Sequence, residues 1–170
     1  MLTNYDLEEL CDFYDVPLQG IFMKDMLPKK IKNGNYIINL ESSYGGRNNG
    51  THWTCLVVEN KNAVFYDPYG APPSMEIRDF VHQRKNSHLG FNNCVVQDLK
   101  SENCGYFVLS FLVHISDASN DVYRAANTYL NQFVDDTQHN DFILKSLYKN
   151  LKKQHPLIQR LYRQALLNKK

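Results

Sequence analysis

The sequence contains few cysteines, and they are not spaced like metal ligands. Cys11, Cys55, Cys94 and Cys104 are far apart, with no CxxC pair that would hold zinc and no dense set that would form a disulfide framework. We therefore expect reduced thiols in a reducing compartment, and neither a metal nor another cofactor.

Long apolar segments and a basic amino-terminal start are also absent. The longest apolar stretch, CGYFVLSFLVHI, is shorter than the ~20 residues that cross a bilayer, and Ser110 and His114 interrupt it. The start of the chain, MLTNYDLEEL, is acidic and does not resemble a signal peptide. These features predict an intracellular protein that makes no membrane contact.

The composition is that of an ordinary globular protein. The 170 residues are 43% hydrophobic, 12% aromatic and 22% charged, without repeats or low-complexity segments. A chain of this length can bury one sizeable core, so residues 1–170 are predicted to form a single domain.

Local patterns predict a mixture of helices and strands. A helix capped by Asn4 starts the chain, an irregular stretch follows Pro17, and YIINLE is a strand. Ser74 caps another helix, NNCVVQ is a short buried strand, and Cys104 to Ile115 forms a central helix that is apolar on nearly every face. Three more helices are predicted near residues 119–134, 140–153 and 156–168. The fold class is therefore α+β.

The segment from residue 52 to 67 predicts an antiparallel hairpin. HWTCLVVE and NAVFYD are rich in β-branched and aromatic residues, and only Asn60 and Lys61 separate them. The start of the first strand faces the end of the second, which brings His52 and Asp67 to the same rim. Taken alone, a surface histidine and a turn aspartate would be the more common interpretation.

Cys104 begins the predicted central helix. Free backbone N-H groups and the helix dipole favour a thiolate at this position, which makes Cys104 the candidate nucleophile. His52 is the candidate base, Asp67 would orient its ring, and Gln97 offers a neutral amide for a developing oxyanion. Gly105 lacks a side chain and would leave space for a substrate backbone.

Each of these residues has an ordinary structural interpretation when it is considered alone. A buried cysteine is more often a small hydrophobic core residue than a catalyst, and we expect that role for Cys11 and Cys55. The combined pattern favours catalysis: HW at a strand start, DPYG closing the hairpin, and a glutamine seven residues before CGYF.

The strings GGRNNGTHW, FYDPYG and VVQDLKSENCGYFVLSFLVH resemble the adenovirus maturation protease (adenain) and the ubiquitin-like-protein-specific proteases. The resemblance covers most of the chain, and residues 17–28 look most like proteases of virophages and Polinton-type elements. It implies a papain-like or adenain-like cysteine protease fold, in which a small central mixed sheet lies between helices and the nucleophile starts a buried helix.

The resemblance also implies a function. His52, Asp67 and Cys104 would be base, orienting acid and nucleophile, Gln97 the oxyanion donor, and Trp53, Gly46 and Gly105 substrate contacts. The activity would be maturation of viral capsid precursor proteins at Gly-Gly-like sites, by a monomer, in the virion and the host cytoplasm. Asp67 stands where adenovirus enzymes carry glutamate, and Cys94 does not match the cysteine that binds their activating peptide.

The end of the chain is basic. Residues 145–170 hold eight Lys or Arg and no acid, whereas residues 1–144 hold eleven bases against eighteen acids. A solvated helix face and a surface for viral DNA are about equally compatible with this pattern. The candidate DNA contacts are Lys145, Lys149, Lys152, Lys153, Arg160 and Arg163.

Two other functions are compatible with the sequence. One is removal of ubiquitin or a similar modifier from other proteins, which needs an extended surface for a folded partner. The other is a nucleic-acid-binding or structural virion component without activity, against which the complete set of four candidate catalytic residues argues.

Overall fold

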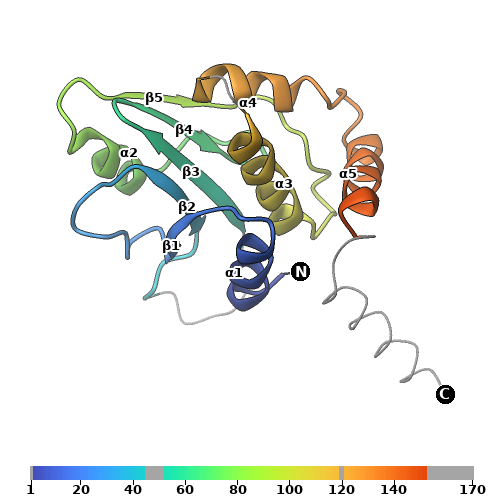
Figure 1. Cartoon of the computed structure of the whole chain (residues 1–170), viewed down its shortest axis with the longest axis horizontal. Coiled ribbons are helices and arrows are strands. Elements are labelled where there is room, and N and C mark those ends of the chain that lie inside the picture. The colour runs from blue at the N-terminus through green and yellow to red at the C-terminus, as the bar shows by residue number, and fades with distance from the viewer. Residues whose placement is uncertain (1, 45–51, 119–120, 153–170) are drawn as a thin grey trace.

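The computed structural model describes residues 2–44, 52–118 and 121–152. In this part of the chain, five helices and five strands alternate irregularly (Figure 1). The helices are α1 (Asn4–Phe13), α2 (Met75–His82), α3 (Cys104–Asp117), α4 (Val122–Leu130) and α5 (Thr137–Lys152). The strands are β1 (Leu18–Met23), β2 (Gly34–Asn39), β3 (Trp53–Glu59), β4 (Asn62–Tyr66) and β5 (His88–Phe91).

The strands form one mixed sheet in the order β1-β2-β3-β4-β5. The central pairs β2·β3 and β3·β4 are antiparallel, and the edge strands β1 and β5 pair in parallel with their neighbours. The predicted hairpin is confirmed as β3 and β4, with a tight turn in which Asn60 has a φ of 55°. Asparagine tolerates this left-handed conformation better than most residues.

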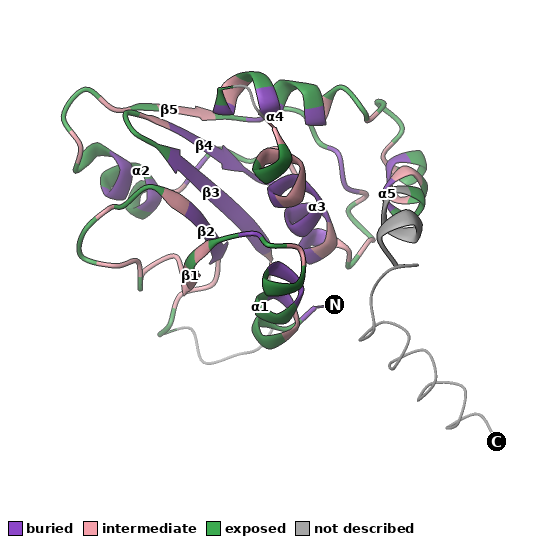
Figure 2. Cartoon of the chain, viewed as in Figure 1, coloured by how far each residue is buried: buried purple, intermediate pink, exposed green. Residues whose placement is uncertain are grey.

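The sheet lies between two hydrophobic cores. Figures 1 and 2 show α2 and α3 on opposite sides of the sheet. Alternate residues of β3 point to opposite faces, so Cys55 packs in the core with α1, α3 and α4, and Leu56 packs in the core with α2. Because both faces are covered, β3 and β4 are apolar at successive positions instead of alternating with polar residues. A sheet between helices agrees with the predicted α+β class.

Helix α3 is the most buried helix of the larger core (Figure 2). Phe107, Leu109 and Phe111 are fully buried, and the Phe111 ring stacks on Tyr66 of β4 with centroids 4.4 Å apart. Burying each such side chain contributes about 1.5–3 kcal/mol. The sheet and this helix therefore hold each other in a fixed orientation, and the start of the helix is fixed with them.

Four sequence predictions are corrected. The residue that caps α1 is Thr3, not Asn4, because Thr3 and Asp6 form a reciprocal capping box. The stretch predicted as irregular contains β1, which is an edge strand with a bulge near Gly20 and half-buried side chains on both faces. The predicted strand NNCVVQ is irregular, and β5 precedes it. Helix α4 spans only part of residues 119–134.

The predicted helix over residues 156–168 lies outside the described residues. None of the helices in the described ranges is long and apolar enough to cross a membrane.

Candidate active site

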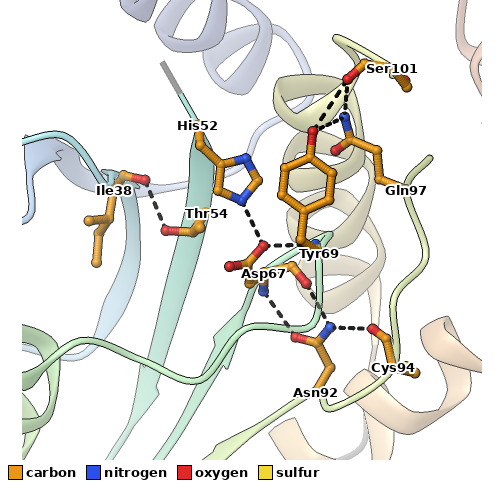
Figure 3. A network of polar contacts seen from close by, with 9 residues as sticks. All are labelled: Ile38, His52, Thr54, Asp67, Tyr69, Asn92, Cys94, Gln97 and Ser101. Atoms are coloured by element: carbon orange, nitrogen blue, oxygen red, sulfur yellow. Dashed lines mark hydrogen bonds and ion pairs between the residues drawn. The ribbon is translucent and has the colours of Figure 1, made fainter. Parts of the chain in front are cut away.

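The open end of the β3-β4 hairpin brings His52 and Asp67 together (Figure 3). His52 directly precedes β3, and its carbonyl oxygen accepts a hydrogen bond from the N-H of Leu40, which fixes the backbone there. Asp67 directly follows β4. Nε2 of His52 donates to Oδ1 of Asp67 over 2.7 Å, with side-chain exposures of 19% and 1%. The sequence-based prediction that these two side chains meet at one rim is therefore confirmed.

Asp67 is held by main-chain and side-chain contacts. The amide of Asn92 pairs with its backbone as a neighbouring strand would: Oδ1 accepts from the Asp67 N-H at 2.9 Å, and Nδ2 donates to the Asp67 carbonyl at 2.7 Å. The N-H of Tyr69 donates to Oδ1 of Asp67 at 2.8 Å. The turn that follows closes at Gly70, whose φ is 68°. Asn92 thus fixes the backbone of Asp67, and the turn through Tyr69 and Gly70 holds its carboxylate toward His52.

Cys104 is the first residue of α3 and is 3% exposed. The preceding Asn103 makes no side-chain cap to the helix, and its Nδ2 donates instead to Asp141 at 3.4 Å. The first-turn N-H groups of α3 and the positive end of its dipole therefore lie at Cys104 without a side-chain cap from Asn103.

Cys104 also lies close enough to His52 to interact with its ring. Burial by itself lowers the pKa of His52, but the hydrogen bonds and negative charges of Asp67 and Cys104 outweigh it and raise this pKa from 6.5 to about 9. Because Nε2 faces Asp67, Nδ1 is the ring nitrogen left for Cys104. The structure thus brings His52, Asp67 and Cys104 together, with an imidazolium between two partners that favour its charge.

Gln97 lies between the hairpin and the start of α3. It is fully buried, its backbone N-H donates to the carbonyl of Pro68, and Nε2 donates to the carbonyl of Ser101 at 2.7 Å. Ser101 is in the loop that leads into α3, and its hydroxyl donates to Oδ1 of Asp141 on α5 at 3.0 Å. The donor end of the glutamine amide is therefore fixed toward the loop of the nucleophile.

Tyr69 and Asn92 are part of this site, although sequence reasoning missed them. The Tyr69 ring stacks on His52 with centroids 4.4 Å apart and an angle of 18° between the planes. In the sequence, Tyr69 belongs to DPYG, which predicts only a turn, and Asn92 begins NNCVVQ, which predicts a strand. The only sequence signal was an aromatic residue two positions after the candidate acid.

The structure changes the reason for a glycine at position 105. A Cβ there would lie 3.2 Å from Cβ of Leu2 and 3.3 Å from Cδ1 of Trp53, so this space is filled by the protein itself and not kept for a substrate. Trp53 is 4% exposed and donates from Nε1 to the carbonyl of Leu2 at 2.9 Å. Substrate contacts of Trp53 and Gly105 stay predictions.

The other predicted residues lie partly inside and partly outside the described ranges. Gly46 lies outside the described residues, as do Lys153, Arg160 and Arg163 and the side chains of Lys149 and Lys152. Lys145 is exposed on α5. Cys94 was expected within a strand, but it is exposed in an irregular segment. In the described ranges, no group of three or more His, Cys, Asp or Glu side chains is arranged to hold a metal.

Comparisons with known proteins support the fold. No protein-family model matches the chain, and no curated protein matches it in sequence. The structure is similar to that of AvrA determined with IP6 and CoA, with a TM-score of 0.50 and 13% identity. The match covers 76% of this chain and 54% of the AvrA chain, so this chain spans about half of that protein. AvrA is a YopJ-family protein, and its protease-like fold is related to that of the adenain-like and ubiquitin-like-protein proteases. The chain shares this protease-like fold.

Proposed function

We propose that the chain is a cysteine endopeptidase in which Cys104 is the nucleophile, His52 the acid-base residue, Asp67 its orienting acid and Gln97 an oxyanion donor. The observation that carries the proposal is the arrangement in which Asp67 and Cys104, the first residue of a buried helix, both interact with His52 and raise its pKa to about 9. Strongly perturbed pKa values with specific charged partners are concentrated at functional sites, which favours a catalytic role for His52 over a purely structural one.

The geometry supports acyl transfer through a thioester. The Cys104 sulfur attacks the peptide carbonyl carbon, and the developing oxyanion accepts hydrogen bonds from the Cys104 N-H and from Nε2 of Gln97, which shares one N-H between the oxyanion and the Tyr69 hydroxyl 3.4 Å away. The His52 imidazolium gives its proton to the leaving amine, so the C-N bond breaks and an acyl-enzyme forms. Neutral His52 then takes a proton from water, whose oxygen attacks the thioester carbon. The C-S bond breaks, the carboxylic acid leaves, and Cys104 and protonated His52 are ready for the next cycle.

We infer further that the substrates are capsid or other virion precursor proteins cut at Gly-Gly-like sites. The support for this is the sequence resemblance to adenain-like and virophage proteases. A preference for glycine is consistent with a Cys104 residue that is only 3% exposed, because a bulky side chain next to the cleaved bond would hinder the approach of its carbonyl.

The experiment that tests the reaction is turnover of peptides with Gly-Gly, Gly-Ala and Leu-Lys centres. The wild-type chain should cut the first two, and Cys104→Ala should be inactive. Cys94→Ala should keep full activity, because Cys94 is exposed and the contact it makes with Asn92 is through its backbone carbonyl, which alanine retains. Equal cleavage by wild type and Cys104→Ala would remove Cys104 as the nucleophile.

Co-expression with the capsid precursor tests the substrate. Processing by wild type but not by Cys104→Ala is expected. Labelling of Cys104 by a ubiquitin-like probe, without precursor cleavage, would favour removal of a modifier instead. The AvrA structure contains CoA, so transfer of an acetyl group from acetyl-CoA should be assayed as well. Acetyl transfer without peptide cleavage would mean that the chain is an acyltransferase and not a peptidase.

DNA binding by the basic end of the chain is a separate proposal. Its support is the excess of Lys and Arg from residue 145 onward. Binding of duplex DNA at low salt that weakens steeply as salt rises is expected. No binding at low salt would rule the DNA contacts out and leave the peptidase proposal intact.

A further inference from the structure

Tyr69 touches both halves of the candidate site (Figure 3). Its ring stacks on the His52 imidazole at a centroid distance of 4.4 Å, and its N-H donates to the same Asp67 oxygen that receives the His52 Nε2 hydrogen bond. One residue therefore contacts the base through its face and the orienting acid through its backbone.

The hydroxyl end of Tyr69 reaches the Gln97 side of the site. It lies 3.4 Å from Nε2 of Gln97 and 3.4 Å from the carbonyl oxygen of Ser101. Nε2 of Gln97 donates to that same carbonyl at 2.7 Å. A rotated amide would point its oxygen at the Ser101 carbonyl oxygen, which repels it, so these contacts fix which end of the Gln97 amide is the donor.

We propose that Tyr69 is a positioning residue that couples the proton-transfer half of the site to its oxyanion half, with its ring restraining His52 and its hydroxyl restraining the Gln97 amide. This inference rests on the proposed peptidase function and deepens it. The oxyanion donor and the imidazole must be in place in the same turnover, and a rigid aromatic ring between them fixes their separation.

The charges around Tyr69 are consistent with this role. Asp67 and Cys104 face both His52 and Tyr69, and Asp98 and Asp141 lie on the hydroxyl side. Burial and then these negative groups raise the pKa of Tyr69, so its hydroxyl keeps its proton, which it donates to the Ser101 carbonyl while it accepts from Nε2 of Gln97. A cation over an aromatic face is favoured, so the stacked ring favours imidazolium over neutral imidazole.

Tyr69→Phe tests the hydroxyl because it keeps the stacked ring. We expect kcat to fall about fivefold with KM unchanged, which corresponds to the loss of one hydrogen bond. The Gln97 side-chain N-H protons should exchange faster with solvent in NMR spectra. Since both changes act through one amide, the double variant with Gln97→Ala should be no slower than Gln97→Ala alone.

Tyr69→Leu tests the stacked face. Loss of the ring should lower the pKa of His52, measured by NMR titration of its ring protons, by roughly half a unit. The alkaline limb of the pH-activity profile should move to lower pH by the same amount, whereas Tyr69→Phe should leave it in place. Tyr5→Phe is the matched control, because Tyr5 is 76% exposed on α1.

The readouts separate failure of this inference from failure of the proposed function. If the wild-type chain cuts no peptide, the peptidase proposal fails, and the two NMR measurements still decide whether Tyr69 restrains His52 and Gln97. An unchanged His52 titration in Tyr69→Leu, or unchanged Gln97 proton exchange in Tyr69→Phe, would overturn the coupling. Additive effects of Tyr69→Phe and Gln97→Ala on kcat would overturn it as well.

Discussion

Replacing Asp67 by Asn should lower the pKa of His52 and slow the reaction strongly. Asp67 is 1% exposed and supplies both a 2.7 Å hydrogen bond and a negative charge to His52. Asparagine has nearly the same shape and keeps an oxygen for the Tyr69 N-H, but it carries no charge. Burial would then dominate, and the pKa of His52 should fall from about 9 to its ordinary 6.5 or below.

The magnitude follows from the size of this shift. Raising the pKa of His52 from 6.5 to about 9 corresponds to ~3 kcal/mol of preference for the imidazolium, at 1.36 kcal/mol per unit. Because the folded-state pKa is raised, this contribution to stability is fully present below pH 6.5 and is lost as the pH rises through about 9. Asp67→Asn should therefore reduce the free energy of unfolding near pH 6 and make it less dependent on pH between 6.5 and 9.

The assay combines NMR titration of the His52 ring with turnover at pH 7.5. We expect the titration midpoint of Asp67→Asn to lie at least ~2 units below that of wild type, and kcat/KM to fall roughly 100-fold or more. Asp79→Asn, an exposed carboxylate on α2, serves as the control and should change neither value. A wild-type midpoint near 6.5, or an unchanged midpoint in Asp67→Asn, would refute the reasoning.

Three further substitutions give distinct results. Asn92→Ala removes the amide that pairs with the buried N-H and C=O of Asp67. It should lower the free energy of unfolding by about 1–3 kcal/mol in thermal unfolding and should also lower kcat. A wild-type kcat would contradict the role of Asn92. Gly70→Ala places a Cβ 2.7 Å from the Cys94 carbonyl oxygen at a residue whose φ is 68°. The free energy of unfolding should therefore fall by about 1–3 kcal/mol. An unchanged melting temperature would argue against the tight turn. Asp141→Ala removes the acceptor of the Ser101 hydroxyl and should lower kcat several-fold with little change in melting temperature. A change in KM alone would count against a role of Asp141 in positioning the loop that leads into α3.

Sequence patterns predicted the parts of the fold that are buried on both sides. The β3-β4 hairpin and α3 carry nearly continuous apolar residues, because helices cover both faces of the sheet and the sheet and neighbouring helices surround α3. The edge strands β1 and β5 were missed for the opposite reason. Their side chains are half-buried, and Gly20 and Gly90 interrupt them, so neither alternation nor a continuous apolar run is visible.

The candidate triad was predictable because each member stands at the end of a recognisable element. His52 and Asp67 flank the hairpin, so strand pairing brings these two together, and Cys104 starts the helix that the sequence predicts to be central. Asn92 and Tyr69 could not be found in this way. Asn92 reaches Asp67 across 25 positions and Tyr69 reaches Gln97 across 28, and such contacts depend on how irregular segments fold back on the sheet.

The central claim is that His52 activates Cys104, and competition among the four cysteines for iodoacetamide tests it most directly. Cys11 and Cys55 are buried, and burial raises the pKa of Cys11 to about 12 and that of Cys55 well above its ordinary value. Cys94 is exposed, but burial of its thiol raises its pKa, so at pH 6.5 it should react slowly.

Mass spectrometry of each cysteine-containing peptide would measure the four alkylation rates at pH 6.5, for wild type and for His52→Ala. We predict that Cys104 of the wild type is alkylated first, although the residue is only 3% exposed. His52→Ala should lower the alkylation rate of Cys104 at least tenfold and leave that of Cys94 unchanged. Faster labelling of Cys94 than of Cys104, or equal labelling of Cys104 in both proteins, would contradict the central claim.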